Sequence, residues 1–150
     1  MDAVTYPDAN VTKFIMDKVI PLRVPFDAEP IATDFNLKWT PMLVVMDENG
    51  KEHQRTIGFF PPEDLISSIL VGIAKIYFDI GQPAEAIPYL EQVVSKYSKS
   101  SAAPEAIFLL AVCRYKSTHS AQPLKDAYEK LNAEYPQSEW KARALPYRLL

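Results

Sequence analysis

Apolar residues along the chain follow two different periods, and the change falls near Pro61 and Pro62. Before these prolines, short β-branched segments alternate with proline, a pattern that is typical of strands and turns. After them, apolar residues recur every three or four positions over long stretches, which predicts amphipathic helices. The sequence therefore predicts an α+β protein of two domains, residues 1–61 and residues 62–150, the second of them all helical.

The first domain opens with a predicted short helix, because the apolar residues from Val11 to Val19 share one face and Asn10 stands at a capping position. Ile20 to Asp27 alternates apolar side chains with two prolines, which cannot donate ladder hydrogen bonds, so we predict an edge strand there. Glu29 to Phe35 is predicted to form a brief helix, with Pro30 in its first turn.

A hairpin is predicted in the second part of the same domain. Met42 to Met46 is continuously apolar, as expected of a strand that is covered on both faces. Asn49-Gly50 is a strong two-residue hairpin signal, and Lys51 to Phe59 would be the antiparallel partner. With the edge strand, the sheet would have about three strands.

Four helices and a short final one are predicted in the second domain. Their predicted bounds are 63–80, 83–97, 104–117 and 123–135, and the last piece begins at residue 138. Gly81 would end the first helix, and Pro88 departs from the pattern of the second. Ser138 is a candidate cap for the last piece, and Trp140 would anchor it.

Charge and composition exclude some classes of partner. Hydrophobic residues make up 48% and charged residues 23%, with a formal net charge of -3 and no basic cluster, so neither nucleic acid nor an anionic membrane is expected as a partner. The apolar stretch from Leu65 to Ile80 is interrupted by polar residues and is too short to span a membrane. The first residues do not resemble a secretory signal, so a cytoplasmic protein is expected, or a periplasmic one if a preceding segment is missing.

Candidate chemistry is sparse. The single cysteine, Cys113, allows no CxxC pair or zinc quartet and is expected in the core. His53 and His119 lack partners at ligand or relay spacing and are predicted to lie at the solvated surface, whereas Asp47 and Glu48 read as turn residues. No nucleotide or metalloprotease motif occurs, so we predict no catalytic residue, no metal site and no cofactor.

The helical domain resembles tetratricopeptide repeats, whose period is about 34 residues. With Ala86 at the small position of the second helix, the other matching residues are Leu70, Ile73, Ala74, Tyr77, Gly81, Leu90 and Val93. Ser98 replaces the closing proline, and a second unit spans roughly Ala102 to Pro136. The resemblance implies a protein or peptide partner, with Lys75, Phe78 and Asp79 as candidate groove residues.

Residues 1–80 resemble the C-terminal portion of the thioredoxin family, in which a strand and two helices surround a segment like Trp39-Thr40-Pro41 and a hairpin. In that family the proline matching Pro41 is cis, and the residue before it pairs with an extended peptide. The resemblance therefore implies a peptide-binding segment at Trp39, Thr40 and Pro41. The family's CxxC would precede Met1, so its thiol chemistry does not carry over to this chain.

Three functional hypotheses follow. The leading one is a redox-inactive thioredoxin-like and tetratricopeptide-like scaffold that binds proteins, like a co-chaperone. The alternative is the C-terminal fragment of a thiol-disulfide oxidoreductase whose CxxC lies upstream, and a small-molecule carrier ranks third. The missing segment would also have supplied a central strand, so either the segment from Ile20 to Asp27 moves across or a second copy completes the sheet as a homodimer.

Overall fold

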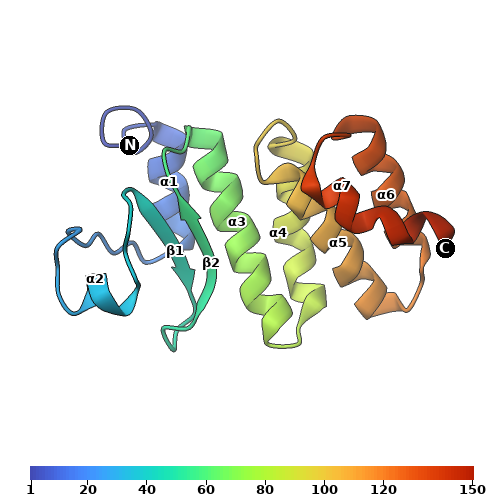
Figure 1. Ribbon diagram of the computed structural model, residues 1–150, viewed down its shortest axis with the longest axis horizontal. Coiled ribbons are helices and arrows are strands. Elements are labelled where there is room, and N and C mark those ends of the chain that lie inside the picture. Colours follow the sequence, from blue (N-terminus) through green and yellow to red (C-terminus); the bar gives the residue numbers. More distant parts are fainter.

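The computed structural model describes all 150 residues and has an α+β architecture, with one two-stranded antiparallel sheet and seven α-helices (Figure 1). The elements in chain order are α1 (Ala9–Lys18), α2 (Ile31–Asp34), β1 (Met42–Met46), β2 (Glu52–Ile57), α3 (Pro62–Asp79), α4 (Pro83–Lys96), α5 (Ala103–Thr118), α6 (Gln122–Glu134), α7 (Glu139–Ala144) and the 3-10 helix η1 (Leu145–Leu149). Figure 1 shows α2 and the hairpin towards one end and the helices α3 to α6 following in order towards the other.

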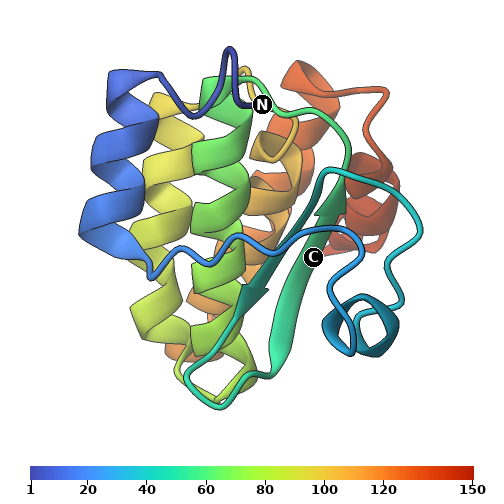
Figure 2. The ribbon, with the colours of Figure 1, turned by 90° about the vertical axis from the view of Figure 1, so that its left-hand side faces the viewer.

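The cap of the first helix lies two residues earlier than predicted. Asp8, not Asn10, is the N-cap residue, and its Oδ1 accepts the backbone N–H groups of Asn10 at 2.8 Å and Val11 at 3.1 Å. Val11 and Phe14 are buried on the inner face of α1, as the apolar spacing predicted. Figure 2 shows α1 beside α3, with the hairpin in front of α3.

The hairpin is confirmed, with Met42 opposite Ile57 and a bulge between Val45 and Met46. The Asp47 side chain accepts the backbone N–H groups of Asn49 at 2.9 Å and Lys51 at 3.0 Å, so Asp47 is a turn residue as predicted. Gly50 has φ 78°, a value that glycine adopts without a steric penalty.

The predicted strand from Ile20 to Asp27 does not form, and the sheet has two strands instead of about three. Residues 20–24 make no backbone–backbone hydrogen bond, because Pro21 and Pro25 lack N–H donors and no neighbouring strand lies within reach. Ile20 is 98% exposed and Leu22 is 76% exposed. The alternative in which this segment moves across to pair with β1 is therefore not found in the structure.

Helix α3 is the central element of the fold. Nine of its residues are buried: Leu65, Ile66, Ser67, Ser68, Ile69, Leu70, Val71, Gly72 and Ala74. One side of the helix contacts the hairpin and α1, and another side contacts α4. At the hairpin, Gly72 lies against the Val45 side chain, so closely that a Cβ atom at position 72 would fall 2.8 Å from Val45 Cγ2. A single core cluster consequently runs from α1 through β1 and α3 to α5.

The remaining helices form antiparallel pairs, within about a residue of the predicted bounds. Between α3 and α4, Tyr77 stacks on Tyr89 with ring centroids 5.6 Å apart, beside the fully buried Ala86 and Leu90. The turn between them uses Gly81 at φ 78°.

The last helix covers the end of the array. Ser138 caps α7 through a hydrogen bond from the N–H of Trp140, and the Trp140 ring lies 5.3 Å from that of Phe108 on α5. Both roles were predicted from the sequence. None of the helices combines the length and the apolar character that crossing a membrane requires.

Candidate functional site

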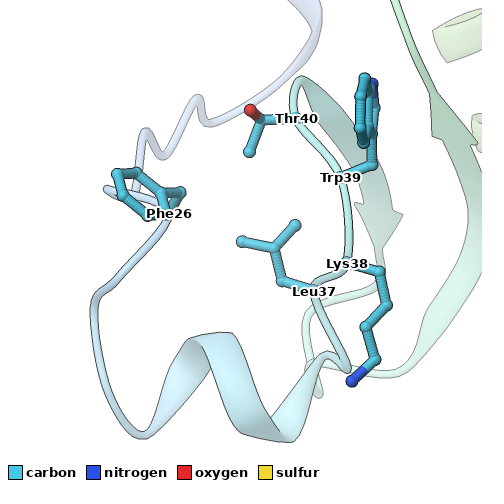
Figure 3. A pocket seen from close by; sticks show the side chains of 5 residues that line it. All are labelled: Phe26, Leu37, Lys38, Trp39 and Thr40. Carbon is cyan, nitrogen blue, oxygen red and sulfur yellow. The ribbon is translucent and has the colours of Figure 1, made fainter.

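The segment before β1 lies at the surface and borders a hollow. The Thr40–Pro41 peptide bond is cis, as the resemblance implied, and Trp39 is 70% exposed. The hollow has a volume of about 250 Å³ and is lined by Phe26, Leu37, Lys38, Trp39 and Thr40. In Figure 3, Leu37 and Thr40 point towards the segment that carries Phe26, whereas Trp39 and Lys38 project away from it. Two of the three predicted peptide-binding residues thus line one open hollow.

Apolar side chains near this hollow have no cover within the chain. Phe26 is 70% exposed, and Ile20 and Leu22 are exposed on the same unpaired segment. Strand β1 pairs only with β2, so the hydrogen-bonding groups of its other edge have no strand partner. An unpaired apolar strand edge of this kind can pair with another strand.

Two of the three candidate groove residues on α3 are already engaged inside the chain. The Lys75 ammonium donates to the Gln54 side chain on β2 and forms an ion pair with Glu105 on α5. The Asp79 carboxylate binds the His53 ring. Phe78 lines a hollow at the end of α3, and Asp79 keeps 41% of its side chain exposed despite its partner. The face of α3 that the repeat resemblance marked as a groove is therefore partly occupied by the hairpin.

His53 was predicted at the solvated surface, and that prediction is wrong. Its side chain is fully buried, with Nδ1 2.6 Å from Asp79 Oδ2 and Nε2 3.1 Å from Asp47 Oδ2. Both ring nitrogens can donate at once only in the protonated imidazolium. The hydrogen bond with His53 lowers the pKa of Asp47 below its ordinary 3.8, and the backbone N–H of Lys51 adds to the effect. His53 thus fastens the hairpin to the end of α3.

No sequence signal pointed to this contact, because Asp79 lies 26 positions from His53 along the chain. His53, Asp47 and Asp79 do not make a metal site, since no group of three or more His, Cys, Asp or Glu side chains is placed to hold a metal ion.

The His53 contacts predict a pH dependence of stability. Because the Asp47 pKa is lowered in the folded state, its contribution is present above the unfolded pKa near 3.8 and is lost as the pH falls through the lower folded value. The urea midpoint should therefore fall between pH 6 and pH 3, and it should fall less in His53→Leu, which has no donor and so removes the main cause of the lowered pKa. An equal fall in both proteins would contradict this assignment.

A second hollow lies where α3 and α5 end and α4 begins. It has a volume of about 400 Å³ and is lined by Phe78, Gly81, Pro83, Tyr115, Lys116 and His119. The Lys116 ammonium lies 5.5 Å from the centre of the Phe78 ring and has no carboxylate partner. His119 is exposed, as predicted, and ends α5 with φ 58°.

Cys113 is fully buried in the main core, as predicted. Burial raises the pKa of its thiol to about 11. A thiol at this position is almost entirely protonated at neutral pH, so it lacks the thiolate that nucleophilic chemistry needs.

Comparison with known proteins supports one part of the fold. The family model of the tetratricopeptide repeat matches residues 69–100, which include most of α3, all of α4 and the loop that follows. No curated protein and no solved structure matches the chain. The α3–α4 pair is thus similar to a tetratricopeptide repeat within a helical array, a class of structure that generally mediates contacts between proteins.

Proposed function

We propose that this chain is a protein-binding scaffold in which a redox-inactive, thioredoxin-like first half is joined to tetratricopeptide-like helices. The repeat match on α3 and α4 carries the proposal, because such hairpins expose faces that bind other proteins. The cis Thr40–Pro41 bond and the adjacent helix and hairpin support the thioredoxin-like part. A co-chaperone-like role, in which the scaffold holds a client or a second protein, agrees with these features.

The proposed peptide-binding segment is Trp39, Thr40 and Pro41, next to the hollow of Figure 3. An exposed aromatic residue beside an open backbone segment is a common anchor for an extended peptide, since the peptide can bury the ring and pair with the backbone. Groove contacts on the helical half would involve Phe78, with Lys75 and Asp79 as weaker candidates because both already have partners.

The peptide-binding proposal is tested by tryptophan fluorescence. In a Trp140→Phe variant, Trp39 is the only tryptophan, so peptides selected from a random 12-residue library on the full chain should shift its emission. Trp39→Ala should lower the affinity for these peptides by roughly tenfold or more, as expected for an aromatic anchor. Lys18→Ala on α1 is a matched surface control. Library peptides that bind Trp39→Ala with unchanged affinity would contradict the assignment.

The open edge of β1 supports the proposal of a homodimer. A second copy could pair its own β1 antiparallel with this edge and cover the exposed side chains of Ile20 and Leu22. Size-exclusion chromatography at micromolar concentration is expected to give a dimer, and Val44→Pro is expected to shift it to the monomer because proline removes an edge donor. A well-behaved wild-type monomer would exclude this arrangement.

The uncovered edge of β1 also supports a second candidate function. An uncovered strand edge beside exposed apolar side chains is also what the C-terminal part of a thiol-disulfide oxidoreductase would show if its CxxC segment lay upstream. Two cysteine codons with CxxC spacing, in frame and shortly before Met1 in the gene, would favour this function. A stop codon there would favour the scaffold. Reduction of insulin by the present chain above background would contradict the scaffold.

A further inference from the structure

The tip of the hairpin carries the one asparagine of this chain that is followed by glycine. Asn10, Asn36 and Asn132 precede valine, leucine and alanine, whereas Asn49 precedes Gly50. Glycine has no Cβ atom, so its backbone nitrogen is less hindered than that of any other residue. Asn49 and Gly50 are both exposed. The side-chain amide of Asn49 therefore has an unhindered backbone nitrogen as its neighbour in the chain.

This pair of residues can react with itself. Once a base has taken its proton, the Gly50 nitrogen can attack the side-chain carbonyl carbon of Asn49. The new C–N bond closes a succinimide ring, and the side-chain nitrogen leaves as ammonia with that proton. Water then opens the ring, which gives aspartate if the former side-chain carbonyl is attacked at the ring nitrogen bond and isoaspartate if the main-chain carbonyl is. Water is the only co-reactant, and nothing is oxidised or reduced.

The folded turn keeps the attacking nitrogen in another contact. The N–H of Gly50 donates to the Asp47 carbonyl at 3.0 Å. The Asp47 side chain holds the turn on both sides of that bond, because its Oδ1 accepts the N–H groups of Asn49 at 2.9 Å and Lys51 at 3.0 Å. Gly50 must give up its hydrogen bond before it can lose its proton and attack, so the reaction rate should follow the fraction of chains in which the turn is open.

Asp47 also connects the turn to α3. Its other oxygen, Oδ2, lies 3.1 Å from Nε2 of His53, and Nδ1 of His53 lies 2.6 Å from Oδ2 of Asp79 at the end of α3. The His53 side chain is fully buried between the two carboxylates. Opening the turn therefore disturbs hydrogen bonds to charged groups, which are stronger than those between neutral groups.

We propose that Asn49 is a site of spontaneous deamidation whose rate is controlled by the docking of the hairpin on α3 through His53. Either product places a new carboxylate close to Asp47 and Glu48, and isoaspartate also lengthens the backbone of a turn that fits two residues. Conversion thus removes the support of Asp47 and releases the hairpin from α3. This modification goes beyond the proposed scaffold function and does not depend on it.

The first test compares folded and unfolded protein. The full-length chain is incubated at neutral pH with and without urea, and the peptide that contains Asn49 is followed by mass spectrometry, with its two products separated by their elution. In urea, Asn49 should convert fastest of the four asparagines, whereas the folded chain should react at least roughly tenfold more slowly. No conversion in urea, or equal rates with and without urea, would overturn the proposal.

Substitutions test the control by His53. His53→Leu removes both contacts and should speed conversion by roughly tenfold, and Asp79→Asn, which keeps the shape and loses the charge, by roughly fivefold. Asp126→Asn is the matched control, since it makes the same change at an exposed carboxylate on α6, and the rate should stay within about twofold. Circular dichroism shows whether each variant is folded. If His53→Leu does not fold, the two Asp variants decide, and equal rates in them would overturn the proposal.

The effect of the modification is measured on converted protein, separated from the starting material by ion exchange. The amide N–H groups of β2 should exchange with solvent roughly tenfold faster in the isoaspartate form than in the unmodified chain, because the hairpin is released. Unchanged protection of β2 would show that the turn does not hold the hairpin on α3 and would contradict the proposal.

Discussion

Leu70→Ala is expected to lower the free energy of unfolding by about 2–5 kcal/mol, among the largest effects of any single truncation in this chain. Leu70 is fully buried in α3, and its core cluster joins α1 and β1 to α4 and α5. The loss combines the transfer free energy of the deleted methyl groups with the cavity that close-packed neighbours cannot fill.

Because this core is shared, both halves of the molecule should unfold in one transition. In the Trp140→Phe background, urea curves from Trp39 fluorescence and from helical circular dichroism should coincide and shift together in Leu70→Ala. Leu149→Ala makes the same chemical change at a side chain that is 80% exposed, and it should alter stability by no more than about 0.5 kcal/mol. Two separated transitions would show that residues 1–61 and 62–150 fold independently.

Gly72→Leu is expected to destabilise the protein by about 1–3 kcal/mol, despite the better helix propensity of leucine. A Cβ atom at position 72 would lie 2.8 Å from Val45 Cγ2 and 2.9 Å from Val45 Cβ. Valine is branched at Cβ and cannot rotate away from such a contact, so β1 would have to move off α3.

A double-mutant cycle separates this clash from a general effect on the helix. Val45→Ala should partly relieve the clash that Gly72→Ala introduces. The double variant should therefore lose at least about 1 kcal/mol less unfolding free energy than the two single variants lose together. Additive effects within about 0.3 kcal/mol would mean that the close approach of Gly72 to Val45 does not set the position of the hairpin.

Much of the helical half was predictable because its signals are local. Each of these signals depends on residues close together in the sequence. They are the prolines in the first turns, Gly81 at the end of α3 and the 3.6-residue apolar spacing. The Asn49-Gly50 turn likewise specified the hairpin before any long-range contact was known. The cap of α1 was predicted at Asn10 but is Asp8, because both residue types suit a cap and they stand two positions apart.

The candidate sites depended on contacts that local patterns do not encode. The burial of His53 requires Asp79, and the engagement of Lys75 requires both Gln54 and Glu105. Each pair joins elements from different parts of the chain, so the hydrogen bonds exist only after the hairpin has docked on α3. The second hollow likewise brings the start of α4 to the ends of α3 and α5.

The sequence by itself determined the helices, the hairpin, the tetratricopeptide-like α3–α4 pair and the burial of Cys113, because periodicity and turn chemistry act over short distances. The tertiary structure alone decided that residues 20–24 stay unpaired, that His53 joins the hairpin to α3, and that Lys116 lies over the Phe78 ring without a carboxylate partner. These outcomes depend on which side chains meet after α3 packs against its neighbours on both sides, and that packing is a property of the whole core.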